Sequence, residues 1–225
     1  MGKLFNFLSG CFRLVSPKME TVWEEPFINE PCVFVCSHVG AMGPIYMSIT
    51  FPLADNVAIW CNHQVMERKE CAEYVRQDFW WKPESKLAPL YSATIPHVAA
   101  AILPPVLTSA PTIPVYHDAR VMSTMRQSLR ALKEGKHVVI FPENPSGYGE
   151  YDERINTGWL NLCVMYHRMT GKALRLWPVY IDRKEHAFRI ARSVVYDVDK
   201  PLAEQEEELA RVLGMGLRGE KSPDA

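Results

Sequence analysis

The chain has 225 residues, of which 48% are hydrophobic and 23% are charged, and its formal net charge is −1. These values are ordinary for a packed globular domain and exclude a disordered, collagen-like or wholly coiled-coil chain. A chain of this size buries enough surface to fold without disulfides or structural metals. Because acidic and basic residues balance, no net positive charge attracts nucleic acid, and we predict no nucleic-acid partner.

The cysteines point to a reducing compartment. Six are present at irregular spacing, without a Cys-x-x-Cys pair, and the N-terminal residues do not match a cleavable export signal. We therefore expect buried, reduced thiols in a cytoplasmic protein. Cys61 and His63 form a close Cys/His pair, but two ligands do not make a zinc site, so we predict no metal.

Residues 1–18 have the pattern of a short amphipathic helix. Apolar residues recur at helical spacing, with basic residues beside them. One interpretation is a helix lying in a membrane surface, and the other is a terminal helix docked on the protein's own core. The apolar residues are Leu4, Phe5, Leu8, Cys11, Phe12 and Val15, and the basic ones are Lys3, Arg13 and Lys18.

Strand and helix patterns alternate through the rest of the chain. Apolar runs predict strands at 33–36, 57–60, 112–116, 137–141, 174–181 and 186–196. Helical spacing predicts helices at 41–49, 68–81, 122–132, 156–169 and 202–213. Pro114 places the third strand at an edge of the sheet or makes it end there. This order predicts a single α/β domain over residues 19–218, with a mostly parallel central sheet flanked by helices and a frayed tail at 219–225.

Residues 87–117 contain no Asp, Glu, Lys or Arg. Six prolines interrupt this run, which argues against an uninterrupted spanning helix. One interpretation is a surface that touches lipid or lines a tunnel for an acyl chain, and the other is a core hairpin under the sheet. We favour lipid contact, because an uncharged run of this length is unfavourable to expose to water.

Two polar side chains directly follow predicted buried strands. His38 follows the strand at 33–36, and Glu143 follows the strand at 137–141 within Phe-Pro-Glu-Asn-Pro-Ser-Gly, whose prolines and glycine favour a tight turn. The carboxyl ends of parallel strands are where α/β sheets place reactive groups. An imidazole there can accept a proton from an attacking hydroxyl. Alternatively, His38 is a hydrogen-bonded core residue and Glu143 lies in a solvated surface turn.

Three segments together resemble the phospholipid/glycerol acyltransferases, of the 1-acylglycerol-3-phosphate acyltransferase type. In that family a strand leads into a His-x4-Asp box, a later strand ends in Phe-Pro-Glu-Gly-Thr-Arg-Ser, and a Gly-bearing helix precedes a Val-Pro-Val strand. Here Ser37-His38 opens the first box and Phe141-Pro142-Glu143 forms the second, while Gly158 and Trp177-Pro178-Val179 match the last two features. The resemblance extends from about residue 20 to residue 182.

The chain departs from the family pattern at the polar positions. Gly43 stands where the family has the Asp that orients the catalytic His, and Asn144-Pro145-Ser146 replaces Gly-Thr-Arg. Near the 112–116 strand, His117 follows where the family motif ends in Arg, and Arg120 is displaced by three residues. A guanidinium is the side-chain group that binds a phosphate monoester best, so these departures weaken the expected binding of a substrate phosphate.

The resemblance implies transfer of an acyl chain from acyl-CoA or acyl-carrier protein, as co-substrate without a further cofactor, to a hydroxyl or amine of a lysophospholipid or related amphiphile. It also implies a peripheral place on the membrane surface, with a lipid acceptor as partner. His38 is the expected general base, and we rank Glu143 ahead of Asp118 and Asp152 as the carboxylate that orients its ring. The remaining expected substrate contacts are Ser37, Met42, Gly43, His117, Arg120, Pro142, Asn144 and Ser146.

Two other functions remain open at this point. Because Gly43 lacks a carboxylate, the chain could be a catalytically impaired acyltransferase fold that binds lipid or acyl thioester without turnover. A thioester hydrolase that needs no acceptor is a weaker alternative. A nucleophilic Cys36 is also conceivable, but Cys36 is more simply a core thiol.

Overall fold

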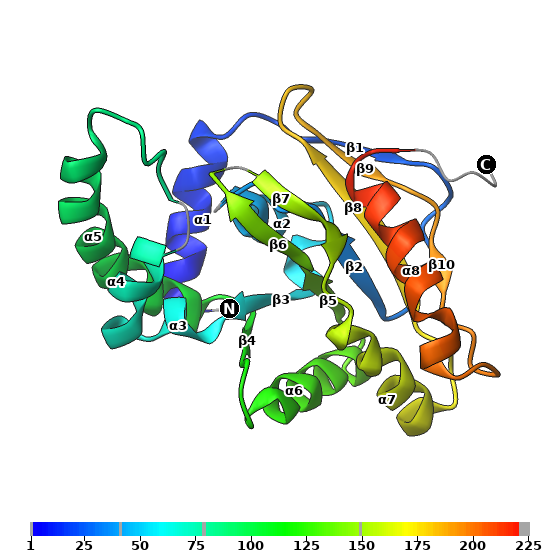
Figure 1. The fold of residues 1–225 in the computed structure, drawn as a ribbon. Helices are drawn as coiled ribbons and strands as arrows, with labels where there is room; N and C mark the ends of the chain where they lie inside the picture. The colour runs from blue at the N-terminus through cyan, green and yellow to red at the C-terminus, as the bar shows by residue number, and fades with distance from the viewer. Residues whose placement is uncertain (1, 41, 78–79, 149, 221–225) are drawn as a thin grey trace.

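The computed structural model describes residues 2–40, 42–77, 80–148 and 150–220. These residues form a mixed α/β fold in which helices flank a mostly parallel central sheet (Figure 1). The main path of the sheet runs β1-β9-β8-β2-β5-β3-β4, and β10 pairs with β8 at one side. The central pairs β8/β2, β2/β5, β5/β3 and β3/β4 are all parallel, so their carboxyl ends lie at one edge of the sheet.

The elements have the following bounds. The strands are β1 (Glu20–Trp23), β2 (Cys32–Cys36), β3 (Val57–Asn62), β4 (Thr112–Val115), β5 (His137–Ile140), β6 (Glu143–Gly147), β7 (Glu150–Ile155), β8 (Arg175–Asp182), β9 (Ala187–Ile190) and β10 (Val194–Val195). The α-helices are α1 (Lys3–Val15), α2 (Met42–Ile49), α3 (His63–Met66), α4 (Arg68–Gln77), α5 (Ala88–Ser109), α6 (Val121–Lys133), α7 (Asn161–Thr170) and α8 (Leu202–Leu217).

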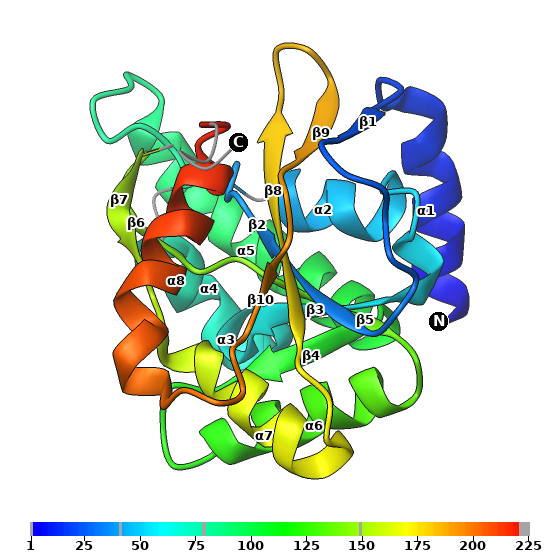
Figure 2. The same cartoon turned by 90° about the vertical axis from the view of Figure 1, so that its right-hand side faces the viewer.

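Strand β2 is buried along its whole length because helices cover both faces of the sheet. Val33 and Val35 point into a core shared with α6, α7 and α8, whereas Phe34 points into a second core shared with α2. Figure 2 shows α1 and α2 on one side of the sheet and α8 on the other. This alternation explains the continuous apolar run, since both sets of side chains must leave water.

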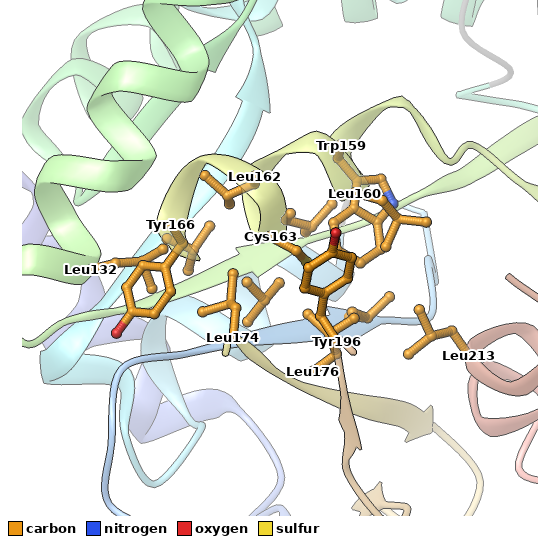
Figure 3. Close-up of a cluster of buried hydrophobic side chains, with 14 of the residues drawn as sticks. Leu132, Trp159, Leu160, Leu162, Cys163, Tyr166, Leu174, Leu176, Tyr196 and Leu213 are labelled. Atoms are coloured by element: carbon orange, nitrogen blue, oxygen red, sulfur yellow. The ribbon is translucent and has the colours of Figure 1, made fainter. Parts of the chain in front are cut away.

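Aromatic and leucine side chains close the core under α7 and α8. Trp159, Leu160 and Cys163 from the α7 region lie against Leu176 of β8 and Leu213 of α8 (Figure 3). At its carboxyl end α8 comes so close to β8 that a Cβ at Gly216 would overlap the Pro178 ring. A glycine is needed there because no larger residue leaves room for the strand.

The predicted fold class is confirmed at the level of a mostly parallel α/β sheet flanked by helices. The edge position expected for the strand with Pro114 is also confirmed, since β4 ends the path of the sheet. The short strand β1 was not predicted, and the turn expected after residue 141 is instead a β-hairpin, β6–β7. Strand β1 pairs with the distant strand β9, and the β6–β7 hairpin has an irregular register. Local periodicity encodes neither feature.

The expectation that prolines break the uncharged run was wrong. Helix α5 continues for 22 residues through Pro96, Pro104 and Pro105. Proline removes a helical hydrogen bond and crowds the preceding turn, but packing of α5 on α4 and α1 compensates for that loss. By length and composition alone α5 could cross a membrane, which is weak evidence of membrane association.

Replacing Gly216 by Ala is expected to lower the free energy of unfolding by about 1–3 kcal/mol, because the new methyl group overlaps Pro178 and displaces α8. Gly10→Ala is the matched control: Gly10 also lies in a helix, α1, but has no atom within 4 Å of an added Cβ. The control substitution should raise the free energy of unfolding by about 0.5–1 kcal/mol. Urea unfolding of both variants measures the difference, and equal effects would contradict this packing.

Candidate functional site

The residues predicted to carry chemistry meet at the carboxyl edge of the sheet. His38 lies two residues after β2, and Glu143 begins β6 three residues after β5. Because β2 and β5 are adjacent and parallel, their carboxyl ends deliver these residues side by side. The backbone N–H of His38 donates a hydrogen bond to Oε2 of Glu143. The two segments are 105 residues apart in the sequence, so only the sheet brings them together.

Glu143 contacts the backbone of His38 rather than its ring. Burial raises the pKa of Glu143, while the hydrogen bond from the His38 amide and the charge of Arg218 act in the opposite direction. The expectation that Glu143 orients the imidazole is therefore not what this geometry provides. Its carboxylate fixes the loop that carries the ring. Of the other two carboxylates considered, Asp118 is bonded to Arg120, and Asp152 is exposed on β7.

The imidazole has a different partner, Tyr151 of β7. The Tyr151 hydroxyl lies 3.1 Å from Nδ1 of His38, and the two ring centroids are 5.4 Å apart. The same hydroxyl accepts a hydrogen bond of 2.9 Å from the backbone N–H of Gly40. Strand pairing places Tyr151 opposite Pro145, so one hairpin carries both Glu143 and Tyr151. Sequence reasoning missed Tyr151, because the hairpin itself was not predicted.

The surroundings of the His38 ring are mostly apolar. The Phe141 ring lies edge-on to it at a centroid distance of 5.2 Å, and burial lowers the pKa of His38 from 6.5 to about 4. The imidazole is therefore neutral at pH 7. Within the described chain, no hydrogen bond is made by its Nε2. The ring can thus present this nitrogen to a ligand at the edge of the sheet.

Gly43 has little space for the side chain that the family resemblance would place there. A Cβ at this position would lie 3.1 Å from Cε1 of Phe141 and 3.5 Å from the backbone oxygen of Ser37. The Phe141 ring, which also touches His38, therefore lies where a box carboxylate would need to start. A glycine at position 43 and the position of the Phe141 ring fit together sterically.

Several of the predicted substrate contacts make interactions within the fold instead of facing solvent. Ser37 is buried and its hydroxyl oxygen accepts a hydrogen bond of 2.9 Å from the N–H of Ile181. Met42 packs against the core shared with α2, and the Pro142 carbonyl accepts from the Asn156 N–H. Asn144 and Ser146 are exposed on β6. Of these residues, Asn144 and Ser146 are exposed, Met42 is partly exposed, and Ser37 and Pro142 are buried.

Cys36 is fully enclosed in the core, and burial raises its pKa well above the ordinary value. A thiolate is the nucleophilic form of cysteine, so this position disfavours a nucleophile. The interpretation of Cys36 as a core thiol therefore agrees with its surroundings.

His117 and Arg120 lie after β4, and β5 and β3 stand between that strand and β2. The Arg120 guanidinium bonds Asp118, stacks on the Tyr116 ring at 4.3 Å and donates toward Nε2 of His63 at 3.3 Å. No hydrogen bond or ion pair joins His117 or Arg120 to His38 or Glu143 in the described residues. The structure therefore does not bring this pair together with the first two boxes.

Arg218 is a cation near the site that sequence reasoning did not identify. It caps the carboxyl end of α8, where Gly216 lies on Pro178 and Gly219 on the Tyr180 ring of β8. The charge of Arg218 lowers the pKa of Glu143, which places the guanidinium within electrostatic reach of that carboxylate. Its side chain also pairs with Glu220. No sequence signal marks Arg218, because its position depends on how α8 packs.

Comparisons with protein-family models, with curated proteins and with solved structures found no match. Within the described residues, no group of three or more His, Cys, Asp or Glu side chains could hold a metal ion. The site is thus defined by its own geometry: a neutral imidazole, held by one hairpin, at the carboxyl edge of a parallel sheet.

The hydrogen bond between Glu143 and the His38 amide predicts a specific pattern of stabilities. Glu143→Ala leaves that N–H unpaired and should lower the free energy of unfolding by about 1–3 kcal/mol. Glu143→Gln keeps an oxygen acceptor of the same shape and should lower the free energy of unfolding clearly less. Chemical denaturation of the three proteins at pH 7 measures both differences. Equal losses in the two variants would show that the acceptor oxygen does not matter.

Proposed function

We propose that this protein transfers an acyl chain from a thioester, acyl-CoA or acyl-carrier protein, to a hydroxyl or amine of a lysophospholipid or related amphiphile. The observation that carries the proposal is the junction of the two predicted boxes: Glu143 binds the amide of His38 at the carboxyl edge of neighbouring parallel strands. The motif order that resembles the glycerolipid acyltransferases supports the same chemistry.

In this reaction His38 acts as the general base. Nε2 takes the proton of the acceptor hydroxyl as its oxygen attacks the thioester carbonyl carbon. The carbon–sulfur bond then breaks, and the imidazolium returns the proton to the departing thiolate. A lowered pKa keeps His38 neutral and able to accept a proton, although it also makes the imidazole a weaker base.

The acceptor need not carry a phosphate in the place that the family resemblance implies. Arg120 is bonded to Asp118, and Asn144-Pro145-Ser146 supplies no guanidinium. The exposed side chains of Asn144 and Ser146 can instead donate to neutral oxygens. These features favour an acceptor whose polar group is smaller or differently placed.

A second candidate is binding of lipid or acyl thioester without turnover. It is favoured by one observation, the contact of the ring with a neutral Tyr151 rather than with a carboxylate. A carboxylate stabilises the imidazolium that forms during base catalysis, and removing it costs about 10⁴ in turnover in a serine protease.

The two candidates separate in an assay with acyl-CoA and acyl-carrier protein, offered with a panel of lysolipid and amine acceptors. His38→Ala should lower turnover by about 10²–10⁴, because the general base is lost. His186→Asn is the matched control, since His186 is exposed in the β8–β9 turn, and it should retain full turnover. Binding that survives His38→Ala, with no turnover by the unaltered protein, would support the binder instead.

We also propose that α1 and α5 hold the protein on an anionic bilayer surface. This proposal combines both alternatives considered for the first helix: Phe5 is buried and Phe12 packs on the core, while Leu4, Phe7 and Leu14 remain exposed on another side. Leu14 is 87% exposed. Lys3 and Lys18 flank this exposed stripe and match anionic headgroups.

Helix α5 extends the same apolar surface. It carries no charged residue, packs against α1, and leaves Leu90, Val98 and Ile102 exposed. The backbone N–H of Gly2 donates to the carbonyl of Ser109, which joins the start of α1 to the end of α5. Two apolar helices in contact expose more apolar surface than scattered single residues do.

Flotation with vesicles of phosphatidylcholine and phosphatidylglycerol tests this surface. Phe7→Asp removes apolar area and adds a negative charge, so it should weaken binding at least about tenfold. Asn6→Asp introduces the same charge on the polar side of α1 and should weaken it much less. Equal binding by Phe7→Asp and the unaltered protein would rule out the α1 stripe as the contact.

A further inference from the structure

We propose that Tyr151 is the positioning residue of His38, and that its phenol oxygen takes the place of the carboxylate that Gly43 lacks. This inference rests on the proposed function, since it concerns how His38 acts as a base. The inference goes beyond that function because Tyr151, which orients the His38 ring, lies in neither of the two boxes. The pairing of β6 with β7 that places Tyr151 is not predicted by either box.

Three contacts define the position of Tyr151. Its oxygen lies 2.9 Å from the Gly40 nitrogen and 3.1 Å from Nδ1 of His38, and the two rings are inclined by only 32°. Gly40 has a φ of +61°, a left-handed conformation that glycine adopts readily, so the backbone turns directly after the amide that Tyr151 accepts from. The phenol therefore holds both the ring of His38 and the loop that carries it.

The contact decides which nitrogen of His38 faces a substrate. With Nδ1 against Tyr151, the nitrogen left to accept the proton of an acceptor hydroxyl is Nε2. For Nε2 to be a base, the proton of the neutral ring must reside on Nδ1, and the Tyr151 oxygen must accept it. The oxygen then accepts from Nδ1–H and from the Gly40 N–H together, and its own proton points to another group.

A phenol in this role orients the ring without charging it. The family carboxylate would raise the basicity of the imidazole, whereas the neutral Tyr151 leaves burial unopposed. This accounts for a ring that is well oriented and weakly basic. It also explains why the Phe141 ring can lie against Gly43: a partner that reaches His38 from the hairpin makes a carboxylate on α2 unnecessary.

The test combines kinetics with nitrogen-15 NMR of the histidine ring. Tyr151→Phe should lower kcat about tenfold and leave KM nearly unchanged, because one hydrogen bond to the base is lost. Tyr148→Phe, at the exposed tip of the same hairpin, is the matched control and should leave kcat unchanged. Above pH 5, the spectrum of the unaltered protein should show Nδ1 protonated and Nε2 bare for His38, assigned with His38→Gln. Tyr151→Phe should show a mixture of the two tautomers.

Each outcome decides a different point. If Tyr151→Phe and Tyr148→Phe have the same kcat, Tyr151 has no positioning role, although the acyl transfer stands. If the proton of the unaltered protein resides on Nε2, Tyr151 is a donor to Nδ1 and the proposal is overturned whatever the activity. Absence of turnover by the unaltered protein overturns the proposed function, and the spectrum still tests the tautomer.

Discussion

The candidate site depends on the hydrogen bonds between the β6–β7 hairpin and residues 38–40. Glu143, at the start of the hairpin, accepts from the His38 amide, and Tyr151, on its second strand, accepts from the Gly40 amide and touches the imidazole. Each neutral bond contributes only about 0.5–1.5 kcal/mol, and the charged acceptor more. Together they hold the backbone at residues 38 and 40 and the ring of His38.

The chemistry that this arrangement permits follows from its lack of charge at the ring. The carboxylate of Glu143 is used by the backbone, and the imidazole is bordered by the rings of Phe141 and Tyr151. Burial therefore dominates the pKa of His38, which lies near 4. Such a base is fully unprotonated at pH 7 and has a small driving force for proton transfer. This balance separates a slow acyltransferase from a binding protein, and it is set by the neighbours of one ring.

In the proposed function, the exposed apolar sides of α1 and α5 would bring the site to an amphiphilic substrate. Helix α1 is apolar on two sides, so it packs on the core through Phe12 and still presents Phe7 and Leu14 outward. Helix α5 lies beside it and carries no charge over 22 residues. Neither helix is needed to complete the sheet. Under the proposal, their exposed sides would contact the lipid surface.

Much of the fold could be predicted from local pattern, because buried parallel strands and amphipathic helices leave strong periodicities. The runs at 33–36 and 137–141 correctly indicated two central strands, and the residues after them indicated where chemistry could lie. Pro114 indicated an edge strand because proline has no backbone N–H to donate to a neighbouring strand. The meeting of His38 with Glu143 also followed from parallel strands sharing one edge.

Tertiary structure decided what touches the imidazole. Tyr151 contacts His38 across 113 residues through an irregular hairpin, and the packing of α8 brings the charge of Arg218 close enough to lower the pKa of Glu143. Neither contact has a periodicity or a short motif that a sequence could display. The same holds for α5, where packing on neighbouring helices overrides the local cost of three prolines. Local sequence encodes which faces are apolar, whereas long-range contacts choose which polar groups share a site, because those choices depend on distances between segments far apart in the chain.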